Sequence, residues 1–184
     1  TGSFNSDLHV FANKNLGLQH IKPAYLDYLA SKAQQLEKNC IGRLATTVQD
    51  AVTRQLVVEC LTEEKASILE IGALYGIGMA MLYNHAITRV HEVRLICLDP
   101  FDGYYGKAVD ALLNQPVNDL TFRRNMKLAN VPESDYSIVK RYSTDPLALE
   151  EVNNHAFNLL IIDGDHSYQG VKYDFEKFFP LLEK

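Results

Sequence analysis

Four short apolar runs alternate with helical patterns along the chain from residue 66 onward. The runs cover residues 68–71, 93–98, 136–139 and 157–162. The last run does not alternate between apolar and polar positions, which is typical of a strand buried on both faces. Helical patterns lie between the runs, at residues 79–87, 119–129 and 146–152, and another follows residue 167. The order of these elements predicts an α/β fold with a parallel sheet.

The first apolar run ends in a glycine-rich turn. Residues 66–78 read ASILEIGALYGIG, so Gly72, Gly76 and Gly78 lie between the strand and the helical pattern. Glycine allows positive φ and a close approach of the backbone to a ligand, and a strand, a glycine turn and a helix are typical of nucleotide sites. A dinucleotide-binding turn reads G-x-G-x-x-G, whereas this turn reads E-x-G-x-x-x-G-x-G from Glu70. An ordinary strand-to-helix turn is the alternative.

Asp99 stands at the end of the second apolar run and is followed by Pro100. Nucleotide folds place a carboxylate about 20 residues after the glycine turn, where it accepts hydrogen bonds from ribose hydroxyls. Asp99 has this spacing, although a simple turn residue before proline is the alternative. The glycine turn and Asp99 together, each after a strand pattern, favour a nucleotide-type site.

The fourth run leads directly into a group of polar residues. Asp163, Gly164, Asp165 and His166 follow the strand, and Ser167 is placed to cap the next helix. Open α/β sheets carry their chemistry at the carboxyl ends of the strands. His166 is the candidate base, because histidine titrates near neutral pH. The alternative for His166 is a residue at the helix N-terminus that Asp163 or Asp165 holds.

These three segments together resemble the class I methyltransferases that use S-adenosylmethionine (SAM). The glycine turn resembles their motif I, and the DGDHSY block resembles the macrocin O-methyltransferase type and, more distantly, the metal-dependent catechol O-methyltransferases. The resemblance implies SAM as cofactor, His166 and Asp163 as catalytic residues, and Asp163 as ligand of Mg²⁺ or another divalent cation. It also implies a small-molecule hydroxyl acceptor of the sugar, glycoside or polyketide type. The implied cofactor contacts are Glu70, Gly72, Ala73, Gly76, Gly78, Asp99, Pro100, Ser143 and Asp163.

The implied fold is a Rossmann-like three-layer sandwich. Right-handed crossovers lay the strands in the order 3-2-1-4, so that Gly72, Asp99 and Asp163 meet at one edge. We expect residues 1–61 to form an N-terminal segment with two packing or lid helices, and residues 62–184 to form the SAM-binding domain. The sequence stops short of the family's strands 5, 7 and 6. We therefore expect an additional chain segment or a second copy to complete the sheet.

Composition narrows the class of function. The chain has 184 residues and a net charge of −5, which does not suit binding to nucleic-acid phosphates. No apolar stretch is long enough to cross a membrane, and the three cysteines lack metal-site spacing, so we expect a cytoplasmic protein with reduced thiols. Two alternatives to an O-methyltransferase stay open: a non-catalytic SAM-binding or interaction domain, and another nucleotide-dependent enzyme such as an NAD oxidoreductase. The glycine spacing weighs against the second.

Overall fold

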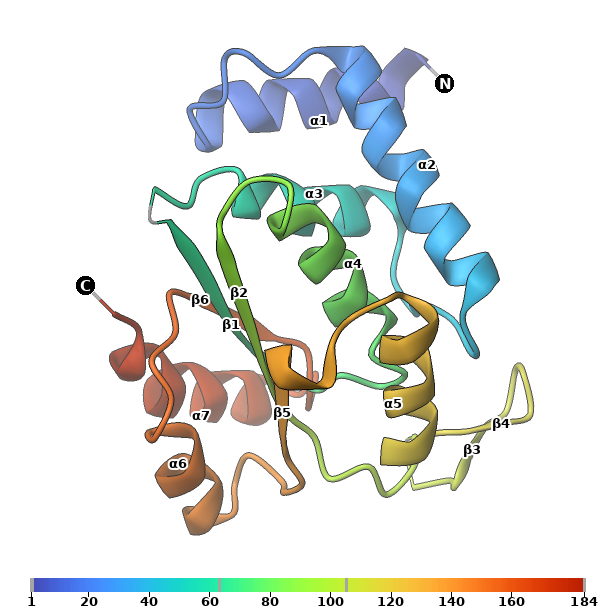
Figure 1. Ribbon diagram of the computed structural model, residues 1–184, viewed down its shortest axis with the longest axis vertical. Coiled ribbons are helices and arrows are strands. Elements are labelled where there is room, and N and C mark those ends of the chain that lie inside the picture. The colour runs from blue at the N-terminus through green and yellow to red at the C-terminus, as the bar shows by residue number, and fades with distance from the viewer. Residues whose placement is uncertain (1, 63, 105, 184) are drawn as a thin grey trace.

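The computed structural model of the chain describes residues 2–62, 64–104 and 106–183. A parallel sheet of four strands lies at its centre, in the order β5-β2-β1-β6 (Figure 1). The strands are β1 (Lys65–Ile71), β2 (Glu92–Leu98), β5 (Tyr136–Val139) and β6 (Leu159–Ile162). When these four strands are numbered by their order along the chain, they lie in the sheet as 3-2-1-4, so the predicted topology is confirmed.

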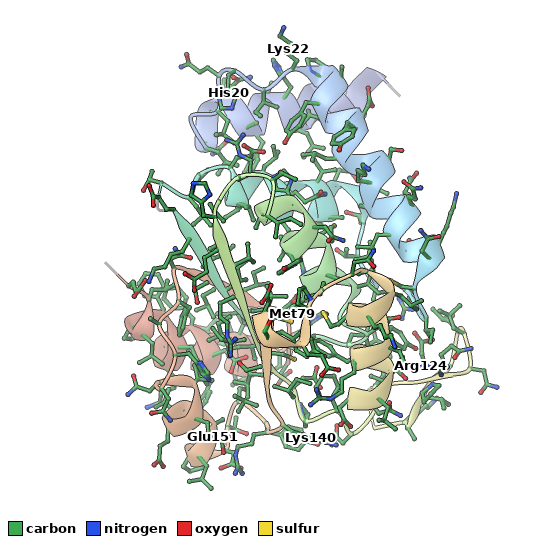
Figure 2. The ribbon with its side chains drawn as sticks, viewed as in Figure 1. His20, Lys22, Met79, Arg124, Lys140 and Glu151 are labelled. Atoms are coloured by element: carbon green, nitrogen blue, oxygen red, sulfur yellow. The ribbon has the colours of Figure 1, made fainter. Side chains whose placement is uncertain are left out.

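Helices cover both faces of the sheet, which makes three layers (Figure 1). One face carries α3 (Val48–Val58), α4 (Ile77–Ala86) and α5 (Asp119–Leu128), and the other carries α6 (Pro146–Val152) and α7 (Tyr168–Phe178). Alternate strand residues enter the two cores: Ile68 packs in the first, and Leu69 packs in the second. Met79 of α4 is fully buried in the first core, whereas Arg124 and Lys140 point outward (Figure 2).

Short polar side chains begin the helices where the sequence places them. Ser167 accepts a hydrogen bond from the Gly170 N–H at the start of α7, and Asp145 does the same for Leu147 ahead of Pro146. Both helix starts were predicted, and both lie at the carboxyl edge of the sheet. The capping residues therefore fix the loops that carry the candidate site.

The N-terminal segment contains a helix that the sequence pattern did not predict. Helix α1 (Gly2–Asn15) precedes α2 (Pro23–Asn39) and α3, so the described residues before β1 form three helices instead of two. Within α1, Leu8 and Ala12 are buried while Val10 is exposed. Two buried positions among the described side chains of α1 give only a weak periodic signal, and the helix gains its stability by packing on α2 and α3.

Buried Glu59, just after α3, connects the N-terminal helices to α4. Its carboxylate accepts a hydrogen bond from the Tyr25 hydroxyl at 2.7 Å and contacts His85 Nε2 at 3.0 Å and Arg89 Nη2 at 2.9 Å. Tyr25 lies on α2, and His85 lies on α4. This cluster holds α3 firmly against α4, which matters because α3 contributes a residue to the candidate site.

The segment after β2 contains a short hairpin. Strands β3 (Val109–Asp110) and β4 (Gln115–Pro116) pair antiparallel. Buried Asp110 accepts a hydrogen bond at 2.7 Å from Arg43, which lies between α2 and α3. The hairpin is therefore fixed to the N-terminal segment. Two 3₁₀ turns complete the described elements, η1 (Glu133–Asp135) and η2 (Phe179–Leu181).

Strand β6 lies at one edge of the sheet. Within the described residues it pairs along its length with β1 only. Leu182 forms a parallel bridge to Phe157, and the Glu183 N–H donates to the Phe157 carbonyl at 2.9 Å. The final described residues thus lie along the beginning of this edge. Four large apolar side chains are exposed along α7 and just after it: Tyr168, Val171 and Phe175 of α7, and Phe179 of η2.

Candidate active site

The glycine turn brings the end of β1 against the end of β6. Gly72 has a φ of +83°, and a Cβ there would lie 2.4 Å from the carbonyl oxygen of Asp163. The Gly72 N–H donates to the Leu98 carbonyl at 2.9 Å, and the Asp163 N–H donates to the Ile71 carbonyl at 2.8 Å. The strand ends that carry Gly72, Asp99 and Asp163 therefore meet at one edge, as expected for parallel strands.

The other two glycines of the turn have different roles. Gly76 has a φ of +75° and precedes α4, and a Cβ there would lie 2.4 Å from the Phe122 ring. Gly78 has no positive φ, and its Cβ would meet only ordinary contacts, at 3.5 Å from Arg54 Nη1 and 3.6 Å from Glu70 Oε1. Gly72 and Gly76 are thus required by backbone geometry, whereas Gly78 is not.

Asp99 supports the backbone of the turn. Its Oδ2 accepts from the N–H groups of Ala73 at 2.7 Å and Leu74 at 3.2 Å, and its Oδ1 accepts from the Phe101 N–H at 2.7 Å. Burial raises the pKa of Asp99, and these three N–H groups oppose that rise. A carboxylate has about four lone-pair positions, so Asp99 keeps acceptor capacity for a ligand while it fixes the turn.

Glu70 is buried beneath the turn and is paired with Arg54 of α3. Its side chain is 3% exposed, and Arg54 Nη1 donates to its Oε1 at 2.9 Å. Burial raises the pKa of Glu70 to about 7, although the Arg54 guanidinium opposes part of the rise. The second carboxylate oxygen, Oε2, is buried and has no hydrogen-bond partner among the described residues. Glu70 therefore retains an unused acceptor at the end of β1.

Asp163 lies between Arg54 and His166 and contacts both. Arg54 Nη2 donates to Asp163 Oδ2 at 2.6 Å, and His166 Nε2 lies 3.2 Å from Asp163 Oδ1. The His166 side chain is 61% exposed. This contact agrees with the alternative in which Asp163 holds His166 at the helix N-terminus. It also orients the imidazole as a base would require, so it does not distinguish the two roles. The catalytic role of His166 stays a prediction.

Asp165 acts locally at the start of α7. Its two oxygens accept from the N–H and the hydroxyl of Ser167, at 2.8 and 3.0 Å. A Cβ on Gly170 would lie 2.5 Å from the Asp165 side chain, so this glycine makes room for the carboxylate. Asp165 is therefore engaged in shaping the loop, and Asp163 is the carboxylate of this loop that contacts the imidazole.

Ser143 lies near Asp174 of α7. The Asp174 residue is 1% exposed, and neither carboxylate oxygen has a hydrogen-bond partner within the described part of the chain. Burial raises the pKa of Asp174, and the Ser143 hydroxyl opposes part of that rise. The expected cofactor contact of Ser143 stays a prediction, as does that of Pro100, which directly follows Asp99.

An open cleft of about 710 Å³ lies beside these residues. Asp163, His166 and Arg54 form one side of it. The segment between α2 and α3 and the first turns of α3 form the rest: Arg43, Ala45, Thr46, Thr47, Asp50 and Thr53, with Glu37 of α2. The N-terminal segment thus supplies most of the cleft wall, and charged or hydroxyl side chains predominate in it.

The described residues do not fit a divalent cation at Asp163. Metal ions of this kind require several oxygen ligands. The described part of the chain contains no group of three His, Cys, Asp or Glu side chains that could hold a metal ion. Both Asp163 oxygens already contact cationic or imidazole groups, from Arg54 and His166. The metal role of Asp163 stays a prediction, and no chemical step below depends on it.

Arg54 is the site residue that the sequence pattern missed. It lies four residues after Asp50 in a helix whose apolar positions pack inward, so it resembles an ordinary surface cation. One signal was present: three carboxylates expected at one buried edge need a positive partner. The sequence did not show which of the basic residues would supply it, because Arg54 is 109 residues away from Asp163 along the chain.

The geometry defines a class I methyltransferase fold, and comparison with known proteins agrees. A family model described as a methyltransferase domain matches residues 69–184. This match covers more than half of the chain, and the chain belongs to that family. No curated protein matches the sequence.

Two solved structures share the fold. The first is cofactor-bound Rv0187 from MTB, with 20% identity and a TM-score of 0.51; the match covers 97% of this chain and 68% of that one. The second is the O-methyltransferase TomG from Streptomyces achromogenes, which is involved in tomaymycin synthesis and was solved with SAM. It has 15% identity and a TM-score of 0.51, and the match covers 99% of this chain and 69% of TomG. At these identities, the likeness shows the fold alone.

Proposed function

We propose that the protein transfers a methyl group from SAM to a hydroxyl of a small, polar acceptor. The observation that carries this proposal is the charge at the carboxyl edge of the sheet. Glu70, Asp99 and Asp163 bring three carboxylates together, and Arg54 is paired with two of them. Such a site has an excess of negative charge, and it favours a cationic ligand. The sulfonium of SAM is a cation, and the acidic residue of motif I in related enzymes contacts its methionine part.

The same charge disfavours a dinucleotide such as NAD. A pyrophosphate binds where backbone N–H groups of the glycine turn and the helix N-terminus face it without nearby negative charge. In this protein the N–H groups of Ala73 and Leu74 donate to Asp99 instead. A pyrophosphate would have to displace a buried carboxylate. This observation adds to the glycine spacing as evidence against an NAD oxidoreductase.

The acceptor fits the cleft next to His166. Its wall contains three threonine hydroxyls and four ionisable side chains besides Asp163 and His166, and no Phe, Tyr or Trp among the described residues. This lining suits a hydroxylated molecule of the sugar or glycoside type better than a flat aromatic ring. His166 takes the proton of the acceptor hydroxyl, the oxygen bonds to the methyl carbon, and the sulfur–carbon bond breaks to leave S-adenosylhomocysteine. Asp163 keeps the imidazole oriented.

Replacement of Asp99 tests the cofactor assignment. We expect S-adenosylhomocysteine to bind the wild-type protein and Asp99→Ala to weaken binding by about 1.5–3 kcal/mol, the scale of a charge-assisted hydrogen bond. Calorimetry measures the affinity. Because Asp99 also holds the turn, Asp99→Asn separates the loss of charge from the loss of shape, and Asp102→Ala, at an exposed position in the next loop, is the control. Equal affinity of wild type and Asp99→Ala would exclude the ribose role.

We also propose that a further strand pairs with the free edge of β6, from an additional chain segment or a second copy. An apolar edge strand with unpaired backbone groups favours association. Light scattering on the 184-residue chain should show self-association that grows with concentration, and hydrogen exchange should show that β6 amides become protected in the associated state. An active, monodisperse monomer with rapidly exchanging β6 amides would contradict this proposal.

None of the described helices could cross a membrane.

A further inference from the structure

We propose that Arg54 binds the α-carboxylate at the amino-acid end of the cofactor. This inference rests on the proposed function, because it takes SAM and S-adenosylhomocysteine as the ligands of the site. It assigns a ligand-binding role to α3, which lies outside the segment that matches the methyltransferase family.

Arg54 has hydrogen-bond donors left over after its two ion pairs. A guanidinium carries five N–H donors. One donates to Glu70 at 2.9 Å and one donates to Asp163 at 2.6 Å, and the rest meet no acceptor within the described part of the chain. The side chain is 20% exposed and forms part of the cleft wall. The remaining donors are therefore accessible to a ligand that enters between β1 and β6.

The amino-acid end of the cofactor needs a cation at this position. Glu70, Asp99 and Asp163 would repel its carboxylate, so a positive group must offset them. Arg43, the other arginine of the cleft wall, is held by Asp110 at 2.7 Å. His166 contacts the far oxygen of Asp163 and is mostly exposed. Arg54 alone among these three lies against Glu70, next to the glycine turn.

Glu70, which would bind the ammonium group of the cofactor, lies beside Arg54. Glu70 Oε2 is buried and has no hydrogen-bond partner among the described residues, and Glu70 Oε1 is bonded to Arg54 Nη1. An unused acceptor thus adjoins a guanidinium with unused donors. An α-amino acid carries an ammonium and a carboxylate on one carbon, so it can satisfy both groups at once. Arg54 is already held in place by its ion pairs, which lowers the entropy cost of binding.

Two ligands that differ only in the carboxylate test this assignment. We would measure by calorimetry the affinities of S-adenosylhomocysteine and its decarboxylated analogue for the wild type, Arg54→Met and Arg54→Lys. The wild type should bind S-adenosylhomocysteine about 10- to 100-fold more tightly than the analogue, the scale of a charge-assisted hydrogen bond. Arg54→Met should bind the two ligands alike, and Arg54→Lys should recover part of the preference. Arg124→Met, at an exposed arginine of α5, should keep the whole preference.

The outcomes separate this inference from the proposed function. If the wild type binds neither ligand, the proposed function fails. If it binds both with equal affinity, the function stands and the role of Arg54 is excluded. A folded Arg54→Met protein that binds both ligands more weakly but keeps the preference would show that Arg54 only holds Glu70 and Asp163 in place. If Arg54→Met does not fold, the wild-type comparison and Arg54→Lys decide the question.

Discussion

Replacement of His166 by alanine should lower turnover by about 10²- to 10⁴-fold and leave the affinity for S-adenosylhomocysteine nearly unchanged. The reason is that a hydroxyl is a weak nucleophile until a base removes its proton. Arg54, on the proposed cofactor side, contacts the other oxygen of Asp163. The imidazole is exposed to the cleft and is oriented by Asp163 at 3.2 Å, so it can receive a proton from an acceptor bound there. Single-turnover methylation assays on a hydroxylated acceptor measure the chemical step.

A second variant distinguishes the base from a residue that only shapes the loop. His166→Gln can still hydrogen-bond to Asp163 but cannot take a proton at neutral pH, so it should be as inactive as His166→Ala. If His166 serves only to hold the start of α7, the glutamine variant should retain most of the activity. His91→Ala removes an exposed histidine before β2 and should behave as wild type. If the activity of His166→Ala were within a fewfold of the wild-type activity, His166 would have only a structural role.

The parts of this protein that could be predicted from sequence are those that local patterns encode. The strand after residue 157 and the cap at Ser167 follow from an apolar run and a short polar side chain, and each was found close to its predicted position. The glycine turn and Asp99 could be placed at one edge because parallel strands with right-handed crossovers leave few arrangements. Sheet order, and with it the location of the site, followed from these local signals.

The parts that could not be predicted depend on contacts between segments far apart in the chain. The described side chains of helix α1 include too few buried positions to show a clear period, and two other helices stabilise it. Arg54 looks like a surface residue until α3 is packed against α4 and the guanidinium meets Glu70 of β1 and Asp163 after β6. The three backbone N–H groups that Asp99 accepts from come from the turn and the next loop, and no spacing rule encodes them. Tertiary packing decides each of these features.

Alanine at Gly72 should be the most disruptive single change in the glycine turn. A non-glycine residue at a φ of +83° is strained, and its Cβ would lie 2.4 Å from a backbone oxygen of Asp163, which cannot move without breaking the contact between β1 and β6. We expect Gly72→Ala to lower the free energy of unfolding by more than about 3 kcal/mol, the sum of backbone strain and a steric clash in the core. Urea denaturation followed by circular dichroism measures this change.

Gly78→Ala is the matched comparison, because it adds the same methyl group to the same motif. Gly78 lies in the first turn of α4 with no positive φ, and the new Cβ would meet Arg54 and Glu70 at ordinary contact distances of 3.5 and 3.6 Å. Alanine favours a helix over glycine by about 1 kcal/mol, so the variant should be as stable as wild type or slightly more stable. If the two variants were equally destabilised, the turn would not depend on the approach of β1 to β6 that Gly72 allows. If Gly78→Ala kept its stability but lost affinity for S-adenosylhomocysteine, Gly78 would serve the ligand rather than the fold, which is the role that its place in the motif implies.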